Sequence, residues 1–343
     1  MQSPIFRAGP LSVGDMLDWA VRIYRARFGK LILTTAIFLV PVGILSGIIS
    51  GQTMTSYLNI FLAALQNPGT LPDANVFSEF QGNSTLLTLS YLLMPFSIAA
   101  NGLVTLALAR QTMAAIHQQD LGVWESVRLT LGRFWAWVGM TLTMYAAYIG
   151  VAIVLVIILF FVLFAFAVAG GLIAFSGFGQ DSEPGFIAFA GMMVALLCLY
   201  VGGLVTMFAP FIYLSTRWAV AMPALVDQKL GPIEALGESW KLTKGHVRRS
   251  IGYVVLIYLF YGVIYTALMT LAVSASAFAL TSSTLASAAI FGVTGALLPV
   301  LWQPLAVAAY VMLYYDLRMR NQGYDLELRI EQLEAEVARA AYA

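Results

Sequence analysis

The side chains that could do chemistry in this chain are few. Its two histidines, His117 and His246, each stand in a basic stretch, far in sequence from any pair of carboxylates. Hydrolysis or group transfer needs a nucleophile with a base, paired carboxylates or a metal ion. No Gly-rich phosphate loop, HExxH or GxSxG pattern is present, and the single cysteine, Cys198, lies in an apolar run. We therefore expect solvated surface histidines, no catalytic residues, no metal site and no cofactor.

A second set of polar side chains lies inside long apolar segments. It comprises Asn101, Gln303 and several tyrosines, among them Tyr145 and Tyr200. These residues could line a cavity for a lipid headgroup or a neutral solute, or they could form the hydrogen bonds that commonly join helices in membranes. The apolar segments contain no Asp or Glu, which argues against a buried proton relay or ion site.

The elements that must position these residues are membrane-spanning helices. Hydrophobic residues make up 60% of the chain and charged residues 10%, against about 25% charged in soluble domains. The 18 Lys and Arg residues fall within 7–30, 110–133, 217–249 and 318–339, whereas the connections between them carry only acidic charges. By the positive-inside rule these four stretches are cytoplasmic, so both termini are cytoplasmic and the number of spans is even.

About 20 apolar residues are needed to cross a bilayer, and six segments meet that requirement. They are 31–50, 85–109, 134–169, 186–215, 251–274 and 287–315. The sequence thus predicts an all-α, polytopic integral membrane protein with six transmembrane helices. Its expected domains are a six-span membrane domain at 1–315 and a cytoplasmic C-terminal helical tail at 316–343.

Each of the first three basic stretches predicts a helix lying in the cytoplasmic interface before the next span. Ser12 and Asp15 form a capping-box signature, and Gly231 with Pro232 marks another helix start. Apolar residues recur on one face of these helices and charges on the other, which is typical of interfacial helices. Short matches at offsets of about 106 to 109 residues suggest three parallel hairpin repeats, although so few matching residues could arise by chance.

Gly43, Gly47 and Gly51 form a tandem GxxxG stripe in the first span. Such a stripe lets two helix backbones approach closely. It could form a dimer face, but we expect it to pack against another helix of the same chain.

The basic stretches also predict lipid contacts. Lys241, Lys244, Arg248 and Arg249 are the candidate headgroup-binding cations, because basic residues near the membrane attract anionic lipids. Nothing in the pattern indicates nucleic acid as a partner. The tail carries an apolar 4-3-4 seam that could bind a partner protein or dock on its own chain, formed by Leu326, Ile330, Leu333 and Val337.

Two longer motifs resemble a known family. They are RWAVAMPALVDQKLGPIEALGESWKLTKGHVRRSIGY at 217–253 and YYDLRMRNQGYDLELR at 314–329. They are similar to the membrane-domain family of glycerophosphoryl diester phosphodiesterases, and LDWAVRIYRARFGKLI at 17–32 looks like that family's opening. That domain occurs alone or fused to a catalytic barrel, whose HR pair and metal-binding acidic cluster are not found here. The resemblance implies a stand-alone, six-span module of the bacterial inner membrane.

These observations favour a non-enzymatic membrane module that serves as a scaffold or a lipid-binding accessory protein. The alternative is a transporter or flippase-like protein for a neutral or lipidic solute. A polar cavity lined by Asn101, Gln303 and span tyrosines would favour transport, whereas a filled apolar centre would favour a scaffold.

Overall fold

The computed structural model describes residues 11–66, 84–177, 208–279 and 284–323, together with positions 191, 194, 202, 203 and 206. Throughout this part of the chain the regular structure is helical, as predicted. The helices are α1 (Val13–Ala26), α2 (Phe28–Gln66), α4 (Ser84–Ile116), α5 (Val123–Leu131), α6 (Phe134–Gly177), α8 (Ala221–Asp227), α9 (Pro232–Thr243), α10 (Val247–Ala279) and α11 (Thr284–Gln322).

The short helices expected at the basic stretches are present as α1, α5 and α9. The Ser12 hydroxyl accepts from the Asp15 N–H, and the Asp15 carboxylate accepts from the Ser12 N–H, which completes the predicted capping box. At the start of α9, the Glu234 carboxylate accepts from the Gly231 N–H at 2.9 Å. Each of the three helices directly precedes a long helix, α2, α6 or α10, as the repeat hypothesis requires.

Five helices of the described chain are long and apolar enough to cross a membrane: Phe28–Ile49, Thr88–Ile116, Phe134–Phe166, Val247–Ala275 and Ala289–Gln322. They coincide with five of the six expected spans. The remaining one, expected at 186–215, lies mostly outside the described residues. The protein is therefore a polytopic membrane protein, and its sixth span stays a prediction.

Helix α11 lies at the centre of the packing and contacts α2, α4 and α10. Its close approach to α2 depends on small residues. A Cβ at position 43 would lie 2.7 Å from Ala296 Cα, and one at position 47 would lie still closer to Gly292 Cα. This geometry confirms that Gly43 and Gly47 pack against a helix of the same chain.

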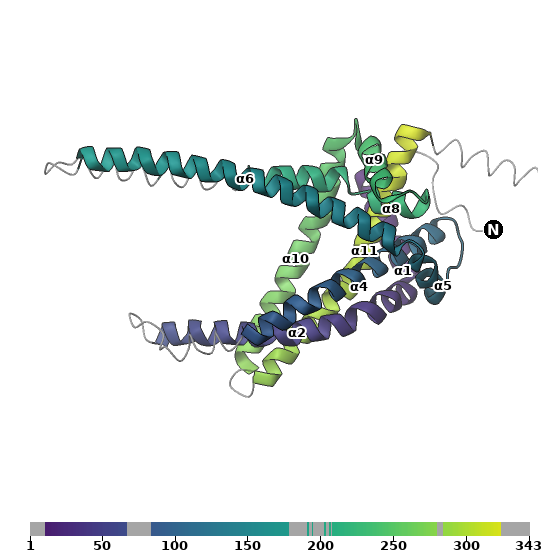
Figure 1. The fold of residues 1–343 in the computed structure, drawn as a ribbon. Helices are drawn as coiled ribbons and strands as arrows, with labels where there is room; N and C mark the ends of the chain where they lie inside the picture. The colour runs from purple at the N-terminus through teal and green to yellow at the C-terminus, as the bar shows by residue number, and fades with distance from the viewer. Residues whose placement is uncertain are drawn as a thin grey trace, which may run out of the picture.

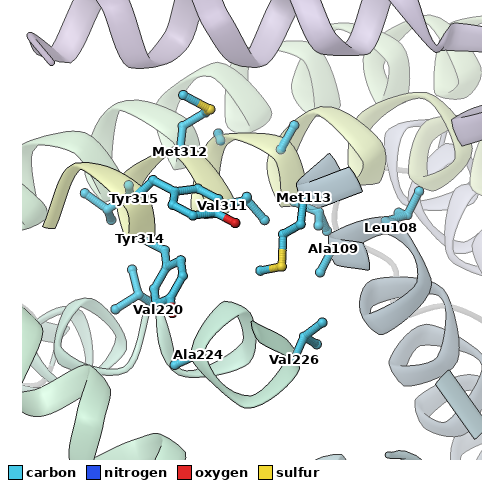
Figure 2. Close-up of a cluster of buried hydrophobic side chains, with 14 of the residues drawn as sticks. Leu108, Ala109, Met113, Val220, Ala224, Val226, Val311, Met312, Tyr314 and Tyr315 are labelled. Atoms are coloured by element: carbon cyan, nitrogen blue, oxygen red, sulfur yellow. The ribbon is translucent and has the colours of Figure 1, made fainter. Parts of the chain in front are cut away.

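The packed core lies at the end of the molecule where α1, α5, α8 and α9 gather (Figure 1). We call this the basic end, because all described Lys and Arg residues lie in these helices, in their connections, or at the adjoining ends of the long helices. Figure 2 shows Met113 of α4, Val220 just before α8, Ala224 of α8, and Tyr314 and Tyr315 of α11 in one cluster. The two tyrosines are fully buried.

Helix α11 runs across the expected boundary between the membrane domain and the tail. Helix α11 continues without a break from the last span to Gln322, so the boundary expected at 315/316 falls inside a helix. Asp316, expected to begin the tail, is fully buried in the core. The tail seam from Leu326 to Val337 lies outside the described residues.

Helix α6 diverges from α2, α4 and α11 as it leaves the basic end (Figure 1). It contacts α4, α8 and α9, yet none of its most apolar stretch is buried by other parts of the chain. Helix α6 therefore spreads away from the other long helices with distance from the basic end, whereas α2, α4 and α10 stay in contact with α11.

Candidate functional site

A cavity of about 420 Å³ is lined by side chains of α4, α6, α8, α10 and α11 and of the segment before α8. Its size falls within the range of about 300–1,000 Å³ that is usual for ligand pockets. The lining side chains are all uncharged: Asn101, Thr105, Trp137, Met140, Thr141, Met144, Tyr145, Tyr148, Ser215, Trp218, Ala219, Met222, Tyr258 and Tyr310.

The polar wall on the α4 side is a hydrogen-bonded group of three side chains. Asn101 and Thr105 lie one helical turn apart on α4, so both face the same direction. From α11, the Gln303 amide Nε2 donates to Asn101 Oδ1 at 3.1 Å and to Thr105 Oγ1 at 2.9 Å. The Thr105 hydroxyl in turn donates to the Asn101 backbone carbonyl. Within the described chain, the Asn101 amide Nδ2 has no acceptor and remains available to a ligand.

The opposite wall is aromatic and comes mainly from α6. The Tyr148 hydroxyl lies 3.0 Å from Ser215 Oγ, and its ring meets Trp218 edge to face at 5.7 Å. Trp137 fills the space beside Gly102 of α4, where a Cβ would overlap its indole ring. Helices α4 and α6 therefore approach closely at this wall of the cavity.

The open side of the cavity is bordered by two tyrosines. Tyr145 of α6 has 52% of its surface exposed and Tyr258 of α10 has 57%. Beyond Tyr145 the exposed side chains of α6 are apolar, beginning with Ile149 and Ile153. A ligand that entered here would place polar groups among the tyrosines and an apolar part along α6.

The structure brings together three of the four residues expected at an intramembrane cavity. Asn101 and Tyr145 line it, Gln303 stands directly behind Asn101, and Tyr200 lies outside the described residues. Thr105, Thr141, Ser215, Tyr258 and Tyr310 were not predicted. The helical spacing of Asn101 with Thr105, and of Thr141 with Tyr145 and Tyr148, is the signal that could have identified part of this set.

The four candidate headgroup cations separate into two groups. Lys241, Lys244 and Arg248 are exposed at the basic end. Arg249 differs, because its guanidinium pairs with Asp316 at 3.2 Å and also donates to the Leu11 carbonyl. Arg249 thus helps to hold the fold together. The other three side chains are exposed enough to approach a membrane surface, although Lys241 also lies 3.8 Å from Glu238 in an ion pair.

Asp316 is the centre of a buried ionic network. Its side chain is fully buried and accepts from the Leu11 N–H at 2.8 Å, from Arg249 Nε and from Arg320 Nε at 3.0 Å. Arg320 also donates to the Leu11 carbonyl at 2.9 Å. The network ties the start of α1 to α10 and α11.

The two histidines lie in the connections that follow α4 and α9. His117 Nε2 lies 3.3 Å from the Tyr315 hydroxyl, and His246 is half-buried with its Nδ1 unbonded. No group of three or more His, Cys, Asp or Glu residues within the described ranges could hold a metal ion.

The pKa of Asp120, an exposed residue in the connection after α4, lies below its ordinary value. The causes are a hydrogen bond from Lys30 and the charge of Lys30, followed by the charge of Arg27.

Comparison with known proteins agrees with the sequence motifs. Residues 184–337 match a family described as the membrane domain of glycerophosphoryl diester phosphodiesterase. This match confirms the expected resemblance over the second part of the chain and covers α8, α9, α10 and α11. No curated protein and no solved structure matches the chain.

Proposed function

We propose that this protein is a non-enzymatic module of the bacterial inner membrane that binds a lipid in the cavity between α6 and α4. Both termini would lie in the cytoplasm, with the basic end facing it. The cavity is the observation that carries the proposal, because polar and aromatic side chains from four long helices converge there. A pocket with a few well-placed polar groups on an otherwise apolar lining is the usual form of a small-molecule site.

The position of the cavity favours a lipid as the occupant. Tyr145 and Tyr148 lie about three and four turns beyond the start of α6, which at about 5.4 Å per turn places them about 16 and 21 Å along the helix from the basic end. A lipid of the cytoplasmic leaflet would reach these polar groups by inserting its headgroup between α6 and the other helices. The uncovered apolar surface of α6 continues from the cavity along the rest of the helix and would contact acyl chains.

The experiment is copurification in native lipid followed by mass spectrometry of the lipid that remains bound. Tyr148→Phe removes one hydroxyl from the cavity, and Asn101→Leu removes the free amide donor. Thr143→Val is the matched control, because its hydroxyl bonds to Gly139 of its own helix and does not line the cavity. We expect both cavity variants to retain less lipid than the control. Equal lipid content in all three proteins would contradict the proposal.

A flippase-like carrier is the second candidate, and the cavity is also the observation that favours it. A carrier must expose its site alternately to both sides, and α6 meets the other helices mainly near the basic end. A fluorescent-lipid translocation assay in proteoliposomes separates the two functions. A static lipid-binding module gives no protein-dependent translocation, whereas a carrier accelerates it and loses this activity in Tyr148→Phe.

We also propose that the module has no phosphodiesterase activity of its own. Purified protein should leave glycerophosphodiesters intact with or without divalent metal ions. Turnover that survives purification and disappears in His117→Ala or His246→Ala would instead establish an enzyme. Scaffolding through the tail seam is a further proposal, which a pull-down comparing the full chain with one truncated after Gln322 would test.

A further inference from the structure

We infer that the cavity selects a lipid with an uncharged, hydroxyl-bearing headgroup, the chemistry of a diacylglycerol, over an anionic phospholipid. This inference rests on the lipid-binding function proposed above and specifies its ligand. Three features of the cavity carry it: the lack of charge in its lining, the kind of hydrogen-bonding groups it presents, and the apolar surface that continues from it.

The first feature is the absence of a counter-charge for a phosphate. None of the lining residues is ionisable near neutral pH. The nearest arginine in sequence, Arg217, directs its guanidinium elsewhere: it lies 4.0 Å from the Trp240 ring and donates to Thr243 Oγ1 at 3.1 Å. Moving an unpaired phosphate into such a site would cost far more free energy than moving a hydroxyl group.

The second feature is a match in hydrogen-bonding capacity. Tyrosine, serine and threonine hydroxyls both donate and accept, and Asn101 Nδ2 adds a donor without an acceptor in the described chain. A ligand hydroxyl can donate to one of these groups and accept from another. A phosphate oxygen only accepts, so it would leave the acceptor capacity of the lining unused.

The third feature separates a lipid from a free polyol. Met140, Met144 and Met222 contribute flexible apolar surface inside the cavity, and methionine adapts readily to chains of varied shape. Outside it, Ile149 and Ile153 extend the apolar surface along α6, with more than half of each side chain exposed. A free polyol would leave these surfaces without a partner, whereas acyl chains cover them.

The test is equilibrium binding to the full chain in detergent, with labelled dioleoylglycerol as the probe and dioleoylphosphatidylglycerol or glycerol as competitors. Tyr148→Phe keeps the ring and removes one hydroxyl, so affinity for dioleoylglycerol should fall by about 2- to 10-fold, the effect of one hydrogen bond. Tyr265→Phe on α10 is the matched control, because Tyr265 does not line the cavity, and it should bind as the wild type does. Circular dichroism and gel filtration of each variant verify folding.

Salt adds a readout that distinguishes an uncharged ligand from a charged one. Binding of dioleoylglycerol should stay unchanged up to about 1 M salt, where charge interactions are screened beyond about 3 Å. Displacement by phosphatidylglycerol at equal concentration, with loss of that binding in Tyr148→Phe, would overturn the inference while leaving a lipid-binding cavity. Displacement by glycerol alone would also overturn it. If Tyr148→Phe and Asn101→Leu change the binding of no lipid, the inference and the proposed function both fail.

Discussion

At the scale of single residues, Asp316 is the most consequential side chain in the described chain. It is fully buried, and two arginines together with the Leu11 N–H surround its carboxylate. A buried ion pair does not guarantee a net gain in stability, but removal of one partner leaves the other charges uncompensated. Asp316 should therefore be required for the packing of α1 against α10 and α11.

We expect Asp316→Asn to destabilise the protein by about 3–5 kcal/mol, the usual cost of breaking a buried ionic pair. Asp18→Asn is the control, since Asp18 forms an exposed ion pair with Arg22 at 2.8 Å, and loss of an exposed pair costs about 0–1 kcal/mol. Thermal unfolding in detergent, followed by tryptophan fluorescence, compares the two variants. Equal melting temperatures for both would show that the Asp316 network does not stabilise the fold.

The sequence predicts that Asp316 begins a cytoplasmic tail, and the reason is physical. A charge that follows a long apolar run is typical of a residue where a helix leaves the membrane. The burial of Asp316 depends on Leu11 and Arg249, which lie 305 and 67 residues away in sequence, and no local pattern reports such contacts. Asn101 was identified because an amide side chain within a span stands out. Tyrosines are common in spans, so residue type alone could not show that Tyr258 lines the cavity as Tyr145 does.

At the scale of elements, α2 and α11 approach each other closely, and the GxxxG stripe in the sequence indicates this contact. Gly43 and Gly47 face Ala296 and Gly292, and the atoms that an added Cβ would meet are mainly backbone atoms. A backbone cannot move aside as a flexible side chain can, so added methyl groups must push the helices apart. In a membrane this costs the van der Waals contacts that hold helices together.

We expect Gly47→Ala to lower the free energy of unfolding by about 1–3 kcal/mol, the range for overpacking a tight contact. Gly150→Ala on α6 is the matched control, because nothing lies within 4 Å of the added Cβ. The control should be neutral or slightly stabilising, since alanine favours the helix over glycine by about 1 kcal/mol. Thermal unfolding of both variants provides the measurement, and a loss of stability confined to Gly150→Ala would contradict the assigned contact.

The helix starts were the most predictable elements. The Ser12 and Asp15 capping box and the Gly231 and Pro232 start depend on residues within one turn, so local sequence determines them. Helix α8 and the divergence of α6 were not predicted. Helix α8 has seven residues, six of them apolar, which is too short a run to show a period. The direction of α6 depends on which helices contact its first turns.

At the scale of the whole molecule, segments far apart in sequence converge on the basic end. Arg27 pairs with Asp120 at 2.7 Å, Arg133 donates to the Leu230 carbonyl, and Arg318 pairs with Asp227 at 2.8 Å. Each of these contacts joins two different basic stretches or their flanking loops. This arrangement is expected if one face of the protein lies against the cytoplasm.

Anionic lipid should bind at this face through charge, separately from the cavity. Neutralising Lys241, Lys244 and Arg248 to Gln should reduce retained phosphatidylglycerol or cardiolipin, because each basic residue near an anionic surface contributes about 1 kcal/mol. Arg249 is left intact, since it supports the fold. Neutralising Arg329 and Arg339 provides the control. Native mass spectrometry at increasing salt concentration measures the lipid that each variant retains. Equal losses of lipid from both sets of variants would mean that the three cations determine the topology only.

The orientation of the whole molecule follows from the same charges and can be measured directly. In a Cys198→Ser background, Asn83→Cys and Ser182→Cys lie in connections without basic residues, so an impermeant thiol reagent should label both in intact cells. Lys244 is exposed at the basic end. Lys244→Cys should therefore react only after the membrane is permeabilised. Labelling of Lys244→Cys in intact cells would instead place the basic end outside the cytoplasm. A lipid in the cavity could then not come from the cytoplasmic leaflet.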